Sequence, residues 1–230
     1  METTKRFEHL YNEIDHHIRE KVNASKEKSF MACLKEYNQR YNLGRSYMTL
    51  RAINELRNLL THQAVSHVPK LAVPSEELMR DMEKIHLQIT KPELVVPRFQ
   101  KPVISLVMTD TLLTALERIS ENDISQFPVE KDGKIEGLLT ENGITRWLAH
   151  HATKKFPLVD LGDVQVKEVL WEEEPRQNYR FIAKNVMMLD AQYQFREQVQ
   201  LEALLITQNG KAGEGLMGIV TRSDVIITAV

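Results

Sequence analysis

Apolar residues recur every three or four positions through the first ninety residues, which is the spacing of one face of a helix. The pattern predicts helices over about 3–22, 26–42 and 75–89, and a further helix that begins near Ser46 and fades before Pro69. Ser75, followed by two acidic residues, is a typical helix N-cap. Four amphipathic helices this close together in sequence predict an up-and-down four-helix bundle over residues 1–90.

Prolines mark the end of this helical pattern. Pro92, Pro97 and Pro102 fall within eleven residues, and proline both ends helices and favours extended chain. The sequence therefore predicts a proline-rich linker over residues 91–102.

The pattern then changes to short apolar runs of the kind found in strands. A strand is predicted in Val103–Met108, and helical spacing follows over Thr111–Ile119. Two further strands flank Asp132-Gly133, a strong hairpin signal, and a helix follows over 142–151. This order predicts a β-α-β-β-α unit in residues 103–155.

The same order recurs over residues 156–230. A strand is predicted in Phe181–Leu189 and a helix in Ala191–Val199. Two strands around Asn209-Gly210 then lead to a last helix from Ser223 to Val230. The best internal match aligns Gly137-Leu138-Leu139-Thr140 with Gly218-Ile219-Val220-Thr221. Two copies of one supersecondary unit constitute an internal repeat.

Composition narrows the class of protein. The chain has 230 residues, of which 42% are hydrophobic and 27% charged, as expected of globular domains. Its single cysteine excludes an internal disulfide and a cysteine-based metal site. No signal peptide and no run of ~20 apolar residues is found, so we expect a cytoplasmic protein without a membrane segment.

Positive charge is concentrated in one part of the chain, although the net charge is only −2. Residues 16–70 hold ten lysines and arginines against four acidic residues, together with four histidines. Such a block can attract phosphate groups, and the alternative is an ordinary solvated helical surface.

Residues from about 100 onward resemble a tandem pair of CBS domains, often called a Bateman module. The resemblance rests on Phe127-Pro128-Val129, on the two aligned Gly-to-Thr segments, and on Arg222-Ser223-Asp224. Residues 164–170 look like the short helix that leads into a CBS strand. The resemblance implies that an adenine nucleotide, such as AMP, ATP or cyclic di-AMP, binds in the cleft between the two copies as a regulatory ligand.

The residues that would hold this nucleotide lie at strand-to-helix junctions. Thr221 can bond a phosphate oxygen, and the N–H groups of a following helix favour the same anion. Asp224 can accept hydrogen bonds from ribose hydroxyls, and Arg222 can add charge opposite a polyphosphate. Thr140 is the first-copy counterpart of Thr221, but Gly143 replaces the aspartate, so we expect one good site per chain. Alternatively, Asp224 only caps a helix.

Residues 1–90 resemble the HEPN superfamily of small helical bundles, many of which are metal-independent ribonucleases. The resemblance rests on the Arg-x4-His motif Arg57-Asn58-Leu59-Leu60-Thr61-His62. A histidine has a suitable pKa for acid or base catalysis of RNA cleavage, and a guanidinium can stabilise the charged phosphorus centre. These roles fall to His62 and Arg57, with Asn58 positioning the substrate.

Helical geometry adds a condition to this hypothesis. Positions five apart lie ~140° apart around a helix, so one helix aims Arg57 and His62 poorly at a common point. The resemblance implies a homodimer in which two motifs face each other. Alternatively, both residues are structural, with Arg57 paired to Glu55 or Asp81 and His62 near a helix C-terminus.

No metal is expected from the sequence. The histidine pairs 16–17 and 150–151 are adjacent residues, which point ~100° apart on a helix and are interpreted as surface residues. The resulting hypothesis is an adenine-nucleotide-sensing protein whose helical domain is a ribonuclease that cleaves RNA under nucleotide control. The alternative is a non-catalytic sensor whose helical domain only dimerises or docks on a partner.

Overall fold

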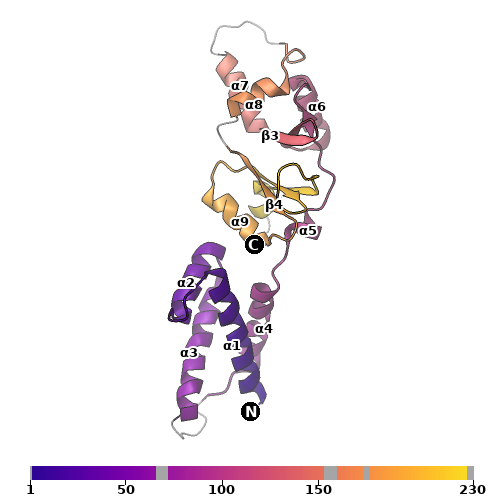
Figure 1. Ribbon diagram of the computed structural model, residues 1–230. Coiled ribbons are helices and arrows are strands. Elements are labelled where there is room, and N and C mark those ends of the chain that lie inside the picture. The colour runs from indigo at the N-terminus through magenta and orange to yellow at the C-terminus, as the bar shows by residue number, and fades with distance from the viewer. Residues whose placement is uncertain (1, 66–71, 153–159, 174–176, 227–230) are drawn as a thin grey trace. The chain divides into compact units, whose positions relative to one another are not determined.

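The computed structural model describes residues 2–65, 72–152, 160–173 and 177–226 of the chain. It divides into two compact units, Met1–Glu93 and Leu94–Val230, which are described separately (Figure 1). The first unit is helical, and the second combines helices with sheets. The boundary falls inside the segment that the sequence predicts to be a linker.

The helical unit consists of α1 (Glu2–Lys21), α2 (Phe30–Tyr41), α3 (Arg45–Val65) and α4 (Glu76–Thr90). Serine caps fix where two of these helices begin. The hydroxyl of Ser29 accepts a hydrogen bond from the N–H of Ala32, and that of Ser75 accepts one from Leu78. Each cap satisfies one N–H that the first helical turn leaves without a partner.

Helix α1 packs against α2, α3 and α4 along its apolar face. A buried hydrogen bond of 2.7 Å crosses this interior, from the hydroxyl of Tyr11 on α1 to the side-chain oxygen of Asn54 on α3. Because both groups are buried, the bond fixes the register of the two helices. The fully buried side chains of this core include Phe7, Ile14, Ile18, Leu34, Leu50, Ile53 and Met82.

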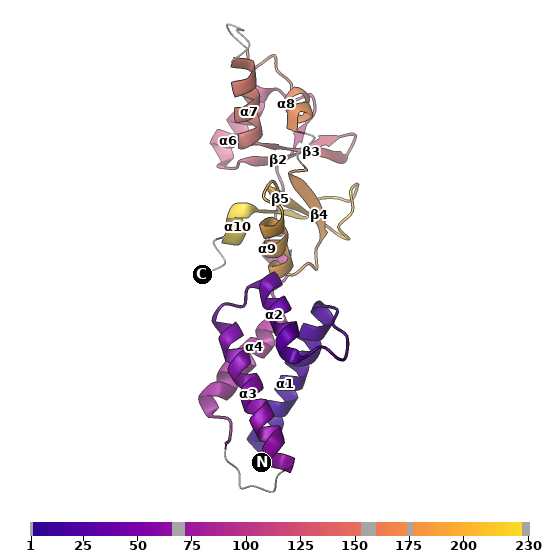
Figure 2. The same ribbon diagram turned by 90° about the vertical axis from the view of Figure 1, so that its left-hand side faces the viewer.

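The second unit contains two three-stranded sheets with the same topology (Figure 2). In each sheet the first and second strands are parallel, and the second and third form an antiparallel pair. The first repeat comprises β1 (Leu106–Val107), α6 (Leu112–Asn122), β2 (Gln126–Lys131), β3 (Lys134–Thr140) and α7 (Glu141–Ala152). The second comprises β4 (Tyr179–Ala183), α9 (Met188–Glu197), β5 (Ala203–Thr207), β6 (Gly218–Thr221) and α10 (Arg222–Ile226).

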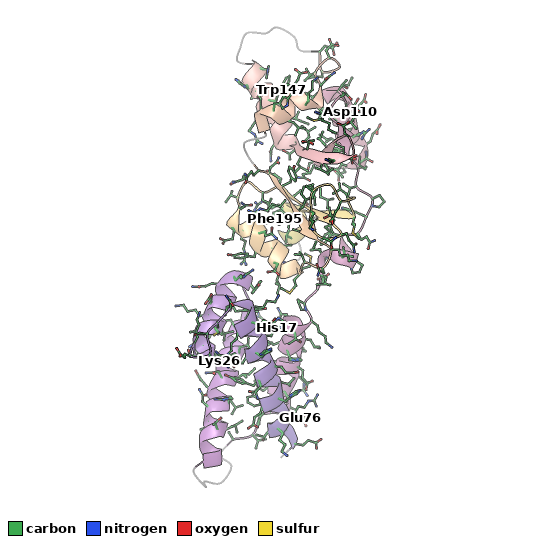
Figure 3. All side chains as sticks on the ribbon, viewed as in Figure 1. His17, Lys26, Glu76, Asp110, Trp147 and Phe195 are labelled. Carbon is green, nitrogen blue, oxygen red and sulfur yellow. The ribbon has the colours of Figure 1, made fainter. Side chains whose placement is uncertain are left out.

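A short helix precedes each repeat. Each of these helices packs on the repeat that it does not lead into. Helix α5 (Val95–Arg98) leads into the first repeat, but Val95 and Phe99 belong to the same core as Phe195 of α9. Helix α8 (Val166–Glu173) leads into the second repeat, but it contributes Val169 to the core around Trp147 of α7. Figure 3 labels Phe195 and Trp147, which mark these two cores.

This exchange crosses the domain limits expected from the pattern of residues. Residues 94–100 of the predicted linker are ordered against the second sheet, where the N–H of Val95 donates to the carbonyl of Val186. A division between residues 155 and 156 places α8 with the second repeat, whereas its apolar face completes the first core. A third cluster, formed by Leu138, Ala203, Leu205 and Ile219, joins the two sheets.

Some predicted elements differ in extent. The strand predicted over Phe181–Leu189 ends at Ala183, because Lys184 and Asn185 form a turn in which the N–H of Val186 donates to the Ala183 carbonyl. Helix α9 then begins at Met188. The run Val103–Met108 forms only the two-residue strand β1. The last helix is α10, and the predicted continuation over 227–230 lies outside the described residues.

Close packing of the lead-in segments depends on one glycine in the third strand of each sheet, Gly137 in β3 and Gly218 in β6. A Cβ on Gly218 would overlap the carbonyl oxygen of Phe99, and one on Gly137 would lie 2.7 Å from a methyl carbon of Leu170. The first neighbour is backbone and cannot rotate away. The second is the far end of a flexible side chain.

We predict that Gly218→Ala destabilises the second unit by about 3 kcal/mol, because overpacking against backbone forces the lead-in segment away from β6. Gly215→Ala is the matched control, since a Cβ there meets nothing within 4 Å. Both tryptophans of the chain, Trp147 and Trp171, lie in this unit, so urea denaturation followed by tryptophan fluorescence measures its stability. Equal midpoints for the two variants would contradict the prediction.

Candidate functional site

A cavity of about 300 Å³ lies in the second unit where three segments of the chain meet. One segment leads into β1, another connects α6 to β2, and the third is the junction of β6 with α10. Thr221 and Asp224, both expected from the sequence, line this cavity together. The other lining residues are Lys101, Pro102, Val103, Ile104, Asp123, Ile124, Ser125, Gln126, Ile219 and Ser223.

The junction between β6 and α10 holds the Asp224 carboxylate in a defined position. Its Oδ2 atom accepts a hydrogen bond from the N–H of Thr221 and another from the Thr221 hydroxyl, both at 2.8 Å. The Thr221 hydroxyl also lies 2.8 Å from that of Ser223. A carboxylate accepts up to about four hydrogen bonds, so a ligand hydroxyl can share Asp224 with Thr221.

The other walls of the cavity add apolar surface and a cation. Val103, Ile104 and Ile219 supply apolar side chains, of which Ile219 is buried. Lys101 supplies an ammonium group from an exposed position. The site thus combines an apolar face, a hydrogen-bond-accepting carboxylate and a positive charge. Lys101 was not predicted from the sequence, because it falls in the segment predicted to be a linker. A lysine directly before an apolar strand was the signal that could have identified it.

Arg222 lies next to this cavity but is directed away from it. Its guanidinium donates hydrogen bonds of 2.9–3.0 Å to the backbone carbonyls of Phe195, Gln198, Val199 and Leu201. These carbonyls lie at and beyond the end of α9, where a helix leaves acceptors without partners. In this structure Arg222 therefore links the end of α9 to the start of α10, whereas the sequence suggested a contact with a polyphosphate.

Thr140 occupies the corresponding position in the first repeat, and its surroundings differ. It is 2% exposed, and its hydroxyl accepts a hydrogen bond of 3.0 Å from the N–H of Gly143. Gly143 offers no carboxylate to a ligand. Thr140 thus caps the start of α7 and does not line either described cavity.

A second cavity, of about 570 Å³, lies beside the first repeat. It is lined by the middle of β3, by Leu170 and Trp171 of α8, and by residues 177–181 around β4. Burial raises the pKa of Tyr179 in its wall, and the nearby Glu136 carboxylate adds to the effect. The Asn178 side chain closes part of this wall by donating to the carbonyl of Leu138 at 3.1 Å.

Arg57 and Asn58 lie side by side on α3 in the helical unit. The guanidinium of Arg57 donates to the Asn58 side-chain oxygen at 3.4 Å, and its central carbon lies 5.4 Å from the centre of the Tyr11 ring. Burial, followed by the Asp15 carboxylate, raises the pKa of Tyr11 to about 12. The ring beneath Arg57 is therefore neutral at physiological pH, and the contact is a cation–π interaction.

If Arg57 were purely structural, an ion pair with Glu55 or Asp81 would be expected. Within the part of the chain that the structure describes, neither Glu55 nor Asp81 forms an ion pair with Arg57, and Asp81 instead lies 3.7 Å from Lys84. Asn58 is exposed. His62 belongs to α3, but its side chain lies outside the described residues.

The CBS-domain sequence profile matches residues 96–150, which contain the first repeat and the segment that leads into it. Among curated proteins, no sequence matches this chain. No described helix is both long enough and apolar enough to cross a bilayer.

Similar solved structures are CBS-domain proteins. The CBS domain of a CBS-domain-containing membrane protein from Sphaerobacter thermophilus is 17% identical, covers 67% of this chain and 99% of its own, and has a TM-score of 0.49. A protein of Methanocaldococcus jannaschii, described as a candidate archaeal homologue of γ-AMPK, is 15% identical over 66% of this chain and 53% of its own, with a TM-score of 0.48. A conserved CBS-domain protein of unknown function from Thermoplasma acidophilum is 18% identical, covers 60% of this chain and 70% of its own, and has a TM-score of 0.48.

The engaged guanidinium of Arg222 yields a test of its role. Arg222→Lys keeps the charge but cannot reach four carbonyls, so we predict a loss of about 2 kcal/mol in the stability of the second unit. Arg180→Lys, at an exposed position on β4, is the control and should leave stability unchanged. Denaturation followed by tryptophan fluorescence measures both. Unchanged stability in Arg222→Lys would contradict the structural role.

Proposed function

We propose that the unit Leu94–Val230 is a regulatory module that binds one adenine nucleotide in the cavity formed by Lys101, Val103, Thr221 and Asp224. The observation that supports this function best is that Thr221 and Asp224 line a single cavity together with apolar side chains and a lysine. The match of residues 96–150 to the CBS domain agrees with a nucleotide ligand.

Each part of a nucleotide has a complementary group in this cavity. The ribose hydroxyls donate to the Asp224 carboxylate, which the Thr221 bonds hold in place. The adenine ring packs against Val103, Ile104 and Ile219. The phosphate lies near the Lys101 ammonium group, because the Thr221 hydroxyl proton is donated to Asp224 and Arg222 stays with its carbonyls. AMP, ATP and cyclic di-AMP share these three parts and are the ligands to compare.

The proposed regulation requires that the nucleotide prefers one arrangement of the protein. A ligand shifts a conformational equilibrium only by the difference in its affinity for the two states. The cavity is built from segments of both repeats, so the bound nucleotide can favour one packing of the repeats over another. The helical unit is proposed as the output of this module.

We predict that Asp224→Asn lowers AMP affinity by ~10-fold or more, because a hydrogen bond to a charged acceptor contributes ~1.5–3 kcal/mol. Asparagine retains an oxygen that can cap α10, so the variant should fold. Wild-type protein should bind AMP more tightly than 2′-deoxy-AMP, whereas Asp224→Asn should bind both with similar affinity. Isothermal titration calorimetry measures all four affinities.

The control for this experiment is Asp163→Asn, an exposed aspartate of the same unit, which should bind AMP as the wild type does. A preference for AMP over 2′-deoxy-AMP that survives Asp224→Asn would contradict the ribose assignment. Absence of binding by AMP, ATP and cyclic di-AMP to the wild type would overturn the proposed function of the module.

A second candidate function concerns the helical unit, which we propose as a metal-independent ribonuclease acting in a homodimer. The supporting observation is that Arg57 is partly exposed beside Asn58 and has no carboxylate partner among the described residues. A guanidinium in this state can bind an RNA phosphate. His62 is the proposed acid or base, and the partner chain supplies the second motif.

We predict that the full-length protein cleaves mixed RNA in the presence of EDTA, and that His62→Ala slows cleavage by ~100-fold or more, as expected for loss of a general acid or base. Arg57→Ala should have an effect of similar size through loss of charge stabilisation. Arg51→Ala, an exposed arginine on the same helix, is the matched control. Gel analysis of end-labelled RNA measures the rates.

Cleavage at equal rates in wild type and His62→Ala, or no cleavage in either, would contradict the ribonuclease hypothesis. The same result would favour the alternative in which the helical unit only dimerises or docks on a partner. Size-exclusion chromatography with light scattering then tests the homodimer directly. The nucleotide proposal for the second unit does not depend on this outcome.

A further inference from the structure

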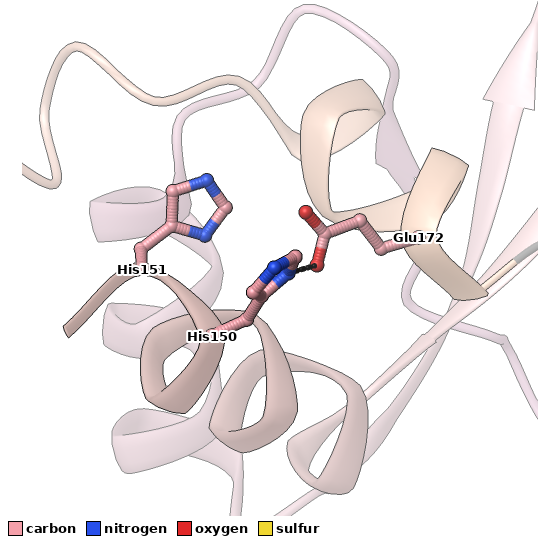
Figure 4. Close-up of side chains that lie close together, drawn as sticks. All are labelled: His150, His151 and Glu172. Carbon is pink, nitrogen blue, oxygen red and sulfur yellow. Dashed lines mark hydrogen bonds and ion pairs between the residues drawn. The ribbon is translucent and has the colours of Figure 1, made fainter. Parts of the chain in front are cut away.

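Helices α7 and α8 bring together three potential metal ligands, none of which lines the proposed nucleotide cavity. His150 and His151 lie at the end of α7, and Glu172 lies near the end of α8 (Figure 4). Each offers one ligand atom, and the three atoms all lie within 4.8 Å of one another. His150 Nδ1 lies 3.3 Å from Glu172 Oε2.

Two adjacent histidines do not form a metal site by themselves, and Glu172 provides the third ligand. Side chains of neighbouring helical residues diverge by ~100°, so a third donor from another element is needed to close a site. Glu172 supplies it, and α8 is held against the first repeat by buried Val166 and Val169. The helices that carry the three ligands are thus fixed by packing, while the side chains themselves are partly exposed.

His151 is oriented in a way that prepares it for a metal. Its Nδ1 lies 2.9 Å from the carbonyl oxygen of Trp147, and its ring stacks on the Trp147 ring with 4.0 Å between centroids. Because a carbonyl only accepts, Nδ1 carries the proton and Nε2 presents a lone pair. Metal-binding histidines are commonly oriented by such a backbone hydrogen bond.

We propose that His150, His151 and Glu172 bind one divalent transition-metal ion of the Zn²⁺ class, with water completing the coordination. Imidazole ligands favour zinc, nickel and cobalt, whereas magnesium and calcium prefer oxygen ligands alone. Ligand distances of ~2.0–2.2 Å require the exposed side chains to rotate slightly toward a common centre. The bound ion ties the end of α7 to α8. No such site was expected from the sequence.

A second histidine–carboxylate group in the helical unit must be distinguished in the test. Glu13 Oε2 lies 2.8 Å from His86 Nε2 and 3.5 Å from His9 Nε2. Both tryptophans of the chain, in contrast, flank the proposed site: Trp147 stacks on His151, and Trp171 precedes Glu172. Tryptophan fluorescence therefore reports on the second unit selectively.

The experiment titrates the full-length protein, stripped of metal with EDTA and then desalted, with Ni²⁺ while tryptophan fluorescence is recorded. We expect Ni²⁺ to quench the fluorescence, with saturation at one equivalent. Zn²⁺ should reverse the quenching by competition, and Mg²⁺ should have no effect on it. His151→Ala and Glu172→Gln should each weaken binding by ~10-fold or more, since even a lost outer-shell partner costs ~10–100-fold. His86→Ala, as the matched control, should bind as the wild type does.

Circular dichroism of every variant checks that it is folded. Glu172→Gln replaces an exposed carboxylate with a side chain of the same shape, so it tests the site even if His151→Ala disturbs the stacked tryptophan. No quenching in the wild type would overturn the proposal. The proposal would also be overturned if Glu172→Gln left the quenching unchanged or if His86→Ala removed it. In either case the metal would bind elsewhere, and Glu172 would form only an ion pair with His150.

Discussion

The exchange of the two lead-in helices is the contact on which the second unit depends. In each repeat the longer helices pack on the sheet, and a lead-in helix adds buried side chains to the same core. Helix α5 completes the core of the repeat it does not enter, and α8 does the same for the other. Burial of their apolar side chains therefore couples the two repeats, because the core of each repeat contains the helix that leads into the other repeat.

This coupling also creates the candidate nucleotide site. Because α5 packs on the second sheet, the chain that follows it passes beside β6, and a bridge joins Gln100 to Gly218. Lys101, Val103 and Ile104 are thereby brought to Thr221 and Asp224. The glycine at position 218 permits the approach because a side chain there would meet the Phe99 carbonyl. A packing requirement and a binding cavity thus share the same few residues.

The contacts that charged residues make near both candidate sites depend on the direction in which each side chain points. Arg222 lies two positions before Asp224 but turns toward carbonyls of α9, whereas Lys101, more than a hundred residues away in sequence, lines the cavity. Arg57 rests over the Tyr11 ring. Spacing in the sequence could identify which residues were chemically capable of phosphate binding, but the direction of a long side chain depends on which acceptors its neighbours leave unsatisfied.

Local patterns determined most of the secondary structure: the helical spacing of the first ninety residues, the Ser75 cap, the Asp132-Gly133 turn and the repeated Gly-to-Thr segment each act over a few neighbouring residues. The pairing of Thr221 with Asp224 was likewise predictable, because they lie three positions apart. Only the tertiary structure decided that the proline-rich segment packs as part of a core, and that Glu172 meets His150 and His151. Such contacts join residues distant in sequence, and they depend on which apolar faces bury each other rather than on any local spacing.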